Sequence, residues 1–229
     1  MGKLISIEDA VALISDGARI MFGGFMGCGN AHKIIDALSK SGKSGFTMIG
    51  NDAAMPGGPL GEEYYGVAKL VHNRQIKRLI ASHVGLNPEV ARQMSEGSLD
   101  LDLIPQGSLV EMIRAGGAGL GGVLTPTGVG TVVQNKSEYV ELVQEIGGKS
   151  YLLMKPLRAD FAIISGHQAD VNGNIWYKGT TRNFNMVMAT AADVVIAEAD
   201  HIVEIGGIEP ENVMTSGVFV DYIVDGGRM

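Results

Sequence analysis

The sequence predicts a three-layer α/β/α fold with a mostly parallel sheet, built as a single domain over residues 1–229. Short apolar runs alternate with stretches of helical period, as is typical of parallel strands joined by helices. A chain of 229 residues, 45% of them hydrophobic, can bury about 70% of its unfolded surface without a disulfide or a metal. The 33 glycines are about twice the usual ~7% share, and they gather in clusters beside the apolar runs, where loops are expected.

The first half of the chain predicts strands and helices in alternation. Residues 7–15 indicate a helix with Ser6 as its N-cap and Asp9 three residues further on. Ser108 and Glu111 form an S-x-x-E capping box, which predicts that a later helix begins there. The other expected elements are strands at 18–22, 46–50, 77–82 and 100–105, and helices at 32–42, which Gly42 ends, at 87–97 and at 108–117.

The second half contains more strand-like runs and fewer helices, with shorter gaps between them. We therefore expect mixed or antiparallel pairing in this half. The expected strands are 151–154, 161–165, 173–177, 193–199 and 218–224. Residues 116–131 form the longest stretch without helical period, and a loop of that length in a compact domain is usually functional.

Charge and cysteine content exclude several classes of protein. Eighteen Lys and Arg are scattered among 25 Asp and Glu, giving a net charge of -7, so we expect no nucleic-acid partner. One cysteine cannot form an internal disulfide, and no His or Cys spacing indicates a metal site. No uncharged run approaches the roughly 20 residues of a membrane span. The beginning of the chain shows no signal peptide, so we expect a cytoplasmic protein without a membrane partner.

A glycine loop, GGFMGCGN at 23–30, follows the first buried strand and precedes a helix. Its glycines would let the backbone approach a ligand closely, and Asn30 could cap a helix whose free N–H groups attract a phosphate or a thioester oxygen. The spacing is neither a Walker loop nor a Rossmann fingerprint. From spacing alone, a ligand site and a tight turn are equally favoured.

Two neutral amides follow neighbouring strands. Gln106 stands after the strand at 100–105, and Asn51 occupies the matching place after the strand that begins at Phe46. Ligands of open α/β sheets bind at this carboxyl edge, where an amide can donate to a carbonyl oxygen without acting as a base. Either residue alone is more often a turn residue, and their matching positions favour a site.

No catalytic nucleophile is evident. Cys28 lies in the glycine loop near a helix start, which lowers a thiol pKa in general, but a nucleophile also needs a base, and His32 stands inside the helix. The other histidines have no ligand spacing, and the chain contains no GxSxG or HExxH motif. The sequence thus predicts a binding pocket that lacks its own reactive group.

Three segments resemble family I coenzyme A transferases. They are DGARIMFGGFMGCGNA at 16–31, the run from IPQGSLVEMIR to TGVGTVV at 104–133, and the run from TTRNFN to HIVEIG at 180–206. The resemblance extends from Ile5 to Ile223. Within the family, the chain resembles most specifically the alpha subunit of the acetate and acetoacetate type. Ala31 stands where the family usually has proline, and the Ser-Glu-Asn-Gly motif of the beta subunit is absent, since Ser95-Glu96-Gly97 lacks the asparagine.

The resemblance implies an enzyme, the alpha subunit of a short-chain acyl-CoA:carboxylate CoA-transferase for acetate, butyrate or acetoacetate. It implies that Gln106 and Asn51 position the substrate and donate to its oxyanion, that the catalytic glutamate lies on a beta subunit, and that the two chains form a heterotetramer or larger assembly. CoA and acyl-CoA would be substrates, with no tightly bound cofactor. The implied CoA-binding residues are Gly23, Gly24, Phe25, Met26, Gly27, Cys28 and Gly29.

Two other readings stay open from the residues alone. A sugar-phosphate isomerase of similar architecture would hold a phosphate at the glycine loop, and so would a ligand-sensing α/β domain. The first needs a carboxylate base and a lysine near the loop, and neither stands out. The second predicts an attached effector domain, for which this chain has no room.

Overall fold

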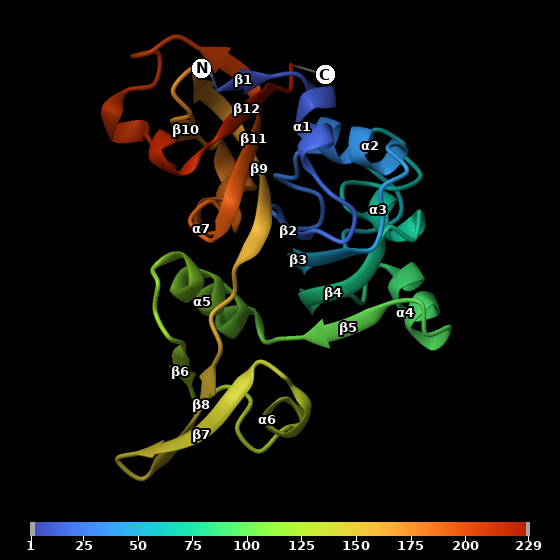
Figure 1. Cartoon of the computed structure of the whole chain (residues 1–229), viewed down its shortest axis with the longest axis vertical. Helices are drawn as coiled ribbons and strands as arrows, with labels where there is room; N and C mark the ends of the chain where they lie inside the picture. Colours follow the sequence, from blue (N-terminus) through green and yellow to red (C-terminus); the bar gives the residue numbers. More distant parts are fainter. Residues whose placement is uncertain (1–2, 228–229) are drawn as a thin grey trace.

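A nine-stranded, mostly parallel sheet forms the centre of the computed structural model, which describes residues 3–227 (Figure 1). Eight strands follow the order β1-β12-β11-β9-β2-β3-β4-β5 in parallel pairs, and β10 pairs with β9 antiparallel. The strands of this sheet are β1 Leu4–Ile5, β2 Arg19–Phe22, β3 Phe46–Asp52, β4 Ile76–His83, β5 Asp100–Leu103, β9 Ala159–Asp170, β10 Ile175–Trp176, β11 Ala192–Val203 and β12 Tyr222–Asp225.

Helices cover both faces of this sheet, which confirms the predicted three-layer architecture (Figure 1). One apolar core lies between the sheet and α1 Ile7–Leu13, α2 His32–Lys40, α3 Ala68–His72 and α4 Pro88–Ser95. A second core lies between the opposite face and α5 Gln106–Gly117 and α7 Asn185–Met188. None of the helices within residues 3–227 is long and apolar enough to cross a membrane.

The second half contains mixed strand pairing, as expected, because β10 pairs antiparallel with β9 while the longer strands of the central sheet pair parallel. β9, β11 and β12 all pair parallel, and β9 and β11 are in register from Ala159–Ala192 to Asp170–Val203. Crossover structure fills the gaps between these parallel strands, although β10 first turns back on β9 as a short hairpin. The gap after β9 holds β10, the short helix η1 Gly179–Arg182 and α7, and the gap after β11 holds η2 Pro210–Asn212 and η3 Gly217–Phe219.

A small antiparallel sheet projects from one end of the molecule and is called the arm here (Figure 1). It consists of β6 Val123–Thr125, β8 Lys149–Met154 and β7 Val140–Ile146, in that order, with α6 Val132–Lys136 beside it. Residues 116–131 are therefore not one functional loop as expected, because β6 takes part of this segment into the arm. β7, which no sequence pattern predicted, forms an exposed edge of the arm.

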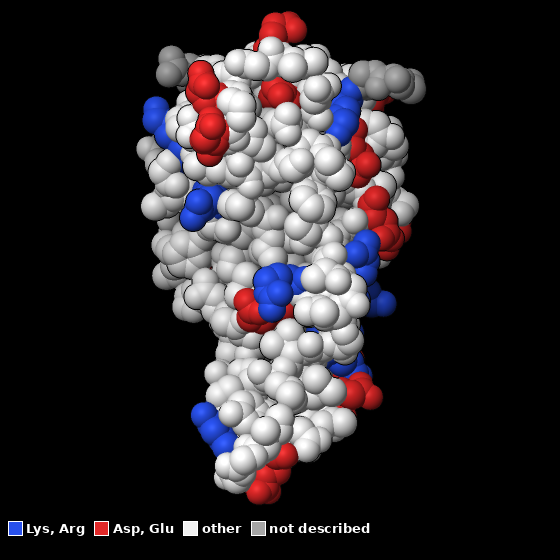
Figure 2. Space-filling model, turned by 90° about the vertical axis from the view of Figure 1, so that its left-hand side faces the viewer, with Lys and Arg blue, Asp and Glu red and all other residues white. Residues whose placement is uncertain are grey.

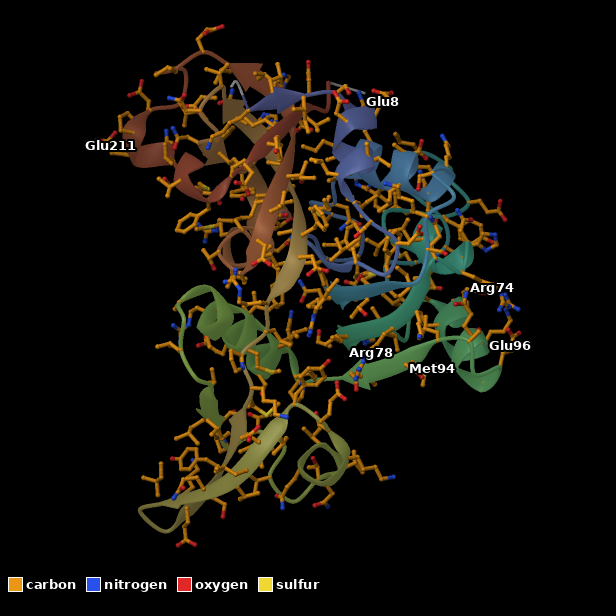
Figure 3. The ribbon with its side chains drawn as sticks, in the orientation of Figure 1. Glu8, Arg74, Arg78, Met94, Glu96 and Glu211 are labelled. Atoms are coloured by element: carbon orange, nitrogen blue, oxygen red, sulfur yellow. The ribbon has the colours of Figure 1, made fainter. Side chains whose placement is uncertain are left out.

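Arg78 on β4 connects the arm to the central sheet (Figure 3). Its guanidinium pairs with Asp102 of β5 at 2.7 Å and with Glu138 ahead of β7, and it lies 5.8 Å from the centre of the Tyr139 ring. Tyr139 is buried, and burial raises the pKa of its hydroxyl to about 12. The base of the arm is thus held by packing as well as by charge.

The helix starts show where local sequence signals succeed and fail. Ser6 caps α1 as predicted, because its hydroxyl accepts the Asp9 N–H at 3.0 Å. The capping box at Ser108 is wrong, because α5 begins at Gln106 after Pro105. The Ser108 hydroxyl instead lies buried in the first turn, without a hydrogen-bond partner among the described residues.

Candidate active site

The residues predicted for the site meet at the carboxyl edge of the central sheet. The glycine loop follows β2, Asn51 is near the end of β3, and Gln106 begins α5 after β5. Because parallel strands present their carboxyl ends at the same edge, three distant segments come together there. A cavity of about 570 Å³ opens at this place. It is lined by Phe25, Cys28, Asn51, Gln106, Val110, Thr180, Asn183 and Phe184.

The two predicted amides are hydrogen-bonded to each other. Gln106 Nε2 donates to Asn51 Oδ1 at 2.9 Å, and Asn51 Nδ2 donates to the Gly24 carbonyl at 3.1 Å. Asn51 is 3% exposed, so its orientation is set by the interior, whereas Gln106 reaches into the cavity. The second N–H of Gln106 remains available for a ligand oxygen.

The backbone of the glycine loop is mostly committed to the protein itself. Phe25 and Cys28 exchange N–H donors with each other's carbonyl at 2.9 Å, which closes a tight turn. The N–H groups of Gly23, Gly24 and Met26 donate to the Ile163 carbonyl, Asn183 Oδ1 and Asp52 Oδ2. Among residues 3–227, the N–H groups of Gly27 and Gly29 make no hydrogen bond, so these two are the free donors of the loop.

The glycines of the loop let other residues of the same protein, rather than a ligand, approach the loop backbone closely. A Cβ on Gly23 would collide with Asn185, and one on Gly29 would collide with the Thr181 carbonyl. Gly24 and Gly27 lie in the same way against Asn30 and the Tyr65 ring. Close packing inside the protein therefore accounts for these glycines without a ligand.

The predicted anion site at the start of α2 is already filled by Glu198 of β11. Its carboxylate accepts the N–H of Lys33 at 3.2 Å and of Ile34 at 2.8 Å. Asn30 does not cap the helix as expected, because its amide donates to the Gly23 carbonyl and accepts the Val67 N–H. A phosphate at this helix end would meet a buried carboxylate, which removes the basis for the isomerase and sensor readings.

A second buried carboxylate, Asp52, fixes the loop from β3. Its two oxygens accept the N–H of Met26 at 2.8 Å and of Ala54 at 2.6 Å. Both of these residues have positive φ, 51° and 50°, which is strained backbone for side chains with a Cβ. Burial raises the pKa of Asp52, and the two N–H donors oppose that shift.

The segment at 180–185 was not predicted to contribute side chains. Asn183 receives the Gly24 N–H and donates to the Cys28 carbonyl, and Asn185 donates to the Gly29 carbonyl. Thr180 and Phe184 line the cavity directly. Asn183 and Asn185 follow a glycine closely in sequence, which is typical of a turn. Nothing in this local pattern indicates that they contact the glycine loop, which lies about 155 residues earlier.

The reactive side chains near the loop do not form a nucleophile and base pair. Cys28 is exposed, and its Sγ lies 3.6 Å from Thr180 Oγ1. His32 stacks on Tyr65 at 4.6 Å, and burial lowers the pKa of its imidazole. The cavity at Gln106 has no Asp, Glu, His, Lys or Arg among its lining residues.

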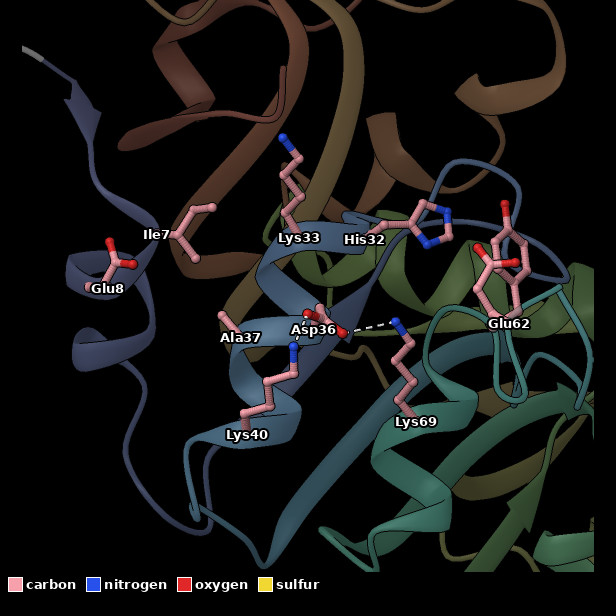
Figure 4. A pocket seen from close by; sticks show the side chains of 10 residues that line it. Ile7, Glu8, His32, Lys33, Asp36, Ala37, Lys40, Glu62 and Lys69 are labelled. Atoms are coloured by element: carbon pink, nitrogen blue, oxygen red, sulfur yellow. Dashed lines mark hydrogen bonds and ion pairs between the residues drawn. The ribbon is translucent and has the colours of Figure 1, made fainter. Parts of the chain in front are cut away.

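Another cavity, of about 520 Å³, lies between α1, α2 and α3 (Figure 4). Asp36 stands at its centre and pairs with Lys40 and with Lys69, the latter at 2.9 Å. Glu8, Lys33 and Glu62 also line this cavity, whereas neither predicted amide does. We therefore place the candidate site in the cavity at Gln106.

The face that bears α5 and α7 shows a broad uncharged area between its charged side chains (Figure 2).

The fold and the site define a class of protein: a three-layer α/β architecture with an amide-lined cavity, in which the Cys28 thiol has no acid or base among the other lining residues. A family model described as "Coenzyme A transferase" matches residues 4–226, so the chain belongs to the coenzyme A transferase family and is an enzyme of that class.

Relatives and solved structures agree with this assignment. The chain is 44% identical to "Acetate CoA-transferase subunit alpha" of Escherichia coli, covering 97% of this chain and 96% of that protein. It is 45% identical to "Acetoacetyl-CoA:acetate/butyrate CoA transferase alpha subunit" of Clostridium acetobutylicum, covering 97% of each.

Among solved structures, an acyl-CoA transferase from Escherichia coli O157:H7, described as a thioester complex with CoA, has a TM-score of 0.84 at 21% identity. That likeness covers 100% of this chain and 48% of that one. Glutaconate coenzyme A-transferase from Acidaminococcus fermentans has a TM-score of 0.77 at 20% identity, covering 97% of this chain and 75% of that one. At these identities the likeness shows the fold.

Proposed function

We propose that this chain is the alpha subunit of a CoA-transferase that exchanges CoA between short-chain acyl-CoA and carboxylates of the acetate, butyrate and acetoacetate class. The catalytic glutamate comes from a separate beta subunit, and the chain is active only with it. The observation that carries this proposal is the cavity at Gln106, which offers amides but no carboxylate, imidazole or amine. The names of two relatives with 44% and 45% identity support the substrate class and the partner subunit.

The proposed reaction passes through the partner's glutamate. Its carboxylate attacks the acyl-CoA carbonyl, the C–S bond breaks, and a mixed anhydride and CoA thiolate form. The thiolate then attacks the glutamyl carbonyl of the anhydride and releases the first acyl group as a carboxylate. The resulting glutamyl-CoA thioester reacts with a second carboxylate through the same two steps in reverse. No oxidant, reductant or net proton is needed.

Each addition places negative charge on a carbonyl oxygen, and Gln106 supplies a neutral donor for it. Asn51 acts as a positioning residue, because its Oδ1 holds one N–H of Gln106 and leaves the other free. A cationic donor would pair with the attacking carboxylate and weaken it as a nucleophile. Neutral amides avoid that competition.

The glycine loop is proposed as the CoA-binding segment. Phe25 and Cys28 line the cavity at Gln106. Gly29 lines a separate cavity with Cys28, and its N–H makes no hydrogen bond among the described residues, so we propose it as the loop donor to CoA. Gly23, Gly24 and Met26 act indirectly, since their N–H groups hold the loop in shape. CoA is a substrate here, and we propose no tightly bound cofactor.

The test is to assay the purified chain alone and with its cognate beta subunit. We expect CoA transfer from butyryl-CoA to acetate only with the pair, and a CoA adduct on a beta-subunit glutamate that hydroxylamine removes. We expect light scattering of the pair to give two copies of each chain or a larger assembly. Full activity from this chain alone, or an adduct on it, would refute the proposal.

A further inference from the structure

The lining of the cavity at Gln106 is divided between polar and apolar side chains. The amides of Asn51, Gln106 and Asn183 are joined by two small polar side chains, Cys28 and Thr180. The remaining lining residues are Phe25, Val110 and Phe184. A group that binds with its carbonyl at the amides therefore places its next carbons against apolar side chains.

Val110 is beside Gln106 by helical geometry. It lies four residues later on α5, so the two side chains project from the same face of the helix about 5–6 Å apart. Both line the cavity. The side chain of Val110 thus gives the cavity an apolar surface one helical turn from the proposed oxyanion donor.

Phe184 is held rigidly at the start of α7. It is 8% exposed and packs in the core beneath α5, and its N–H donates to Asn183 Oδ1 at 2.6 Å. Asn183 is in turn held by the glycine loop. A wall built from Phe184 and Val110 cannot move away from a longer substrate without disturbing the core.

We propose that Val110 and Phe184 form the wall of the acyl pocket and that their size limits the length of the acyl chain. This inference rests on the proposed function. With no cation among the lining residues that this chain supplies, the pocket favours a monocarboxylic acyl group. A second carboxylate on the acyl group would lie unpaired against Val110.

The test compares acetyl-CoA, butyryl-CoA and hexanoyl-CoA as donors for the assembled pair. Val110→Ala should raise the hexanoyl-to-acetyl ratio of kcat/KM about tenfold, the lower end of the effect of one methylene in an apolar pocket. Val110→Leu should lower the same ratio. Phe184→Leu should act like Val110→Ala.

Val187→Ala is the matched control, because Val187 packs on the same core from α7 without lining the cavity. It should leave the ratio unchanged. Ratios within twofold of wild type in both Val110 variants, with assembly and acetyl transfer intact, would overturn the inference while leaving the proposed function in place. An equal change in KM for every acyl-CoA would also overturn the inference, because it would mean that Val110 contacts the CoA part of the substrate rather than the acyl chain. A wild-type pair that transfers no CoA from any of the three acyl-CoA donors would refute both the inference and the proposed function.

Discussion

Gln106 acts through an amide whose direction is set by another amide. Asn51 accepts one N–H of Gln106, and the Gly24 carbonyl accepts an N–H of Asn51. These two hydrogen bonds connect the side chain of Gln106, the proposed oxyanion donor, to the backbone of the glycine loop. The two residues should therefore behave as one unit in kinetics.

We expect Gln106→Ala to lower kcat of the assembled pair about 10²-fold or more, the usual effect of losing one preorganised oxyanion donor. Asn51→Ala should also lower kcat, since the Gln106 amide would be free to rotate. The double variant should be no more than a few-fold slower than the slower single variant. Steady-state kinetics and the Tm of each variant provide the measurement.

The control is Gln144→Ala on the exposed strand β7, which should leave kcat unchanged. If Gln106 is only a structural residue, its removal should cost at most about 1 kcal/mol of stability and leave turnover normal. Effects of the two single variants that multiply in the double variant would contradict the coupling.

At the scale of elements, Glu198 joins β11 to the start of α2. Two helix N–H groups donate to its carboxylate, which supplies the anion that a helix N-terminus favours. Ala31, at the place of the family proline, is followed directly by this helix. The helix start therefore depends on an acid from another strand rather than on its own N-cap.

Burial raises the pKa of Glu198 above its ordinary value, and this outweighs the two N–H donors. The folded protein thus holds this proton more tightly than the unfolded chain does. As pH rises through the raised pKa, the free energy of unfolding should fall relative to that of Glu198→Gln. The advantage of the wild type over the variant should be largest at low pH. Urea unfolding of both proteins at a series of pH values measures the difference.

Glu145→Gln on exposed β7 controls for the loss of one negative charge. A difference between wild type and Glu198→Gln that stays constant with pH would show that burial does not govern this carboxyl. A stability advantage of the wild type over Glu198→Gln that increases as pH rises would mean that the pKa of Glu198 is lowered instead.

Local patterns predicted the elements of the first half well, because their signals lie within a few residues. The period of 32–42 predicted α2, and Ser6 predicted the start of α1. Gln106 and Asn51 could be placed together because parallel strands share a carboxyl edge. The cap of α2 could not be predicted, since Glu198 and Ile34 are 164 residues apart in sequence. The start of α5 was mispredicted because a capping box is two residue types at a spacing, which a helix interior can also contain.

At the scale of the whole molecule, the arm joins the central sheet at its base, where Tyr139, Leu152 and Met154 pack in the same core as α5. The single-domain organisation over residues 1–229 stays a prediction, and the arm is where it can be tested. Arg78 reaches from β4 to Asp102, Glu138 and the Tyr139 ring, so it contacts both parts.

We expect Arg78→Ala to speed amide hydrogen exchange in the arm, residues 123–154, and to leave the core of β9 and β11 protected. The cost in stability should be about 1 kcal/mol or less, because the pairs are partly exposed to water. Arg114→Ala removes a comparable exposed pair with Glu111 on α5 and should leave the arm unchanged. Equal exchange in wild type and Arg78→Ala would show that packing alone holds the arm.

The order of the strands also bears on how the protein is made. β2, β3, β4 and β5 neighbour one another in the order in which the ribosome delivers them, so this part of the sheet can form early. The other edge of β2 must wait until β9 emerges more than a hundred residues later, and β1 must wait for β12. Such long-range pairing slows folding and leaves a strand edge open to wrong partners meanwhile. The first strand synthesised is thus among the last to find its neighbour, and the nascent chain carries an unfinished sheet through most of its translation.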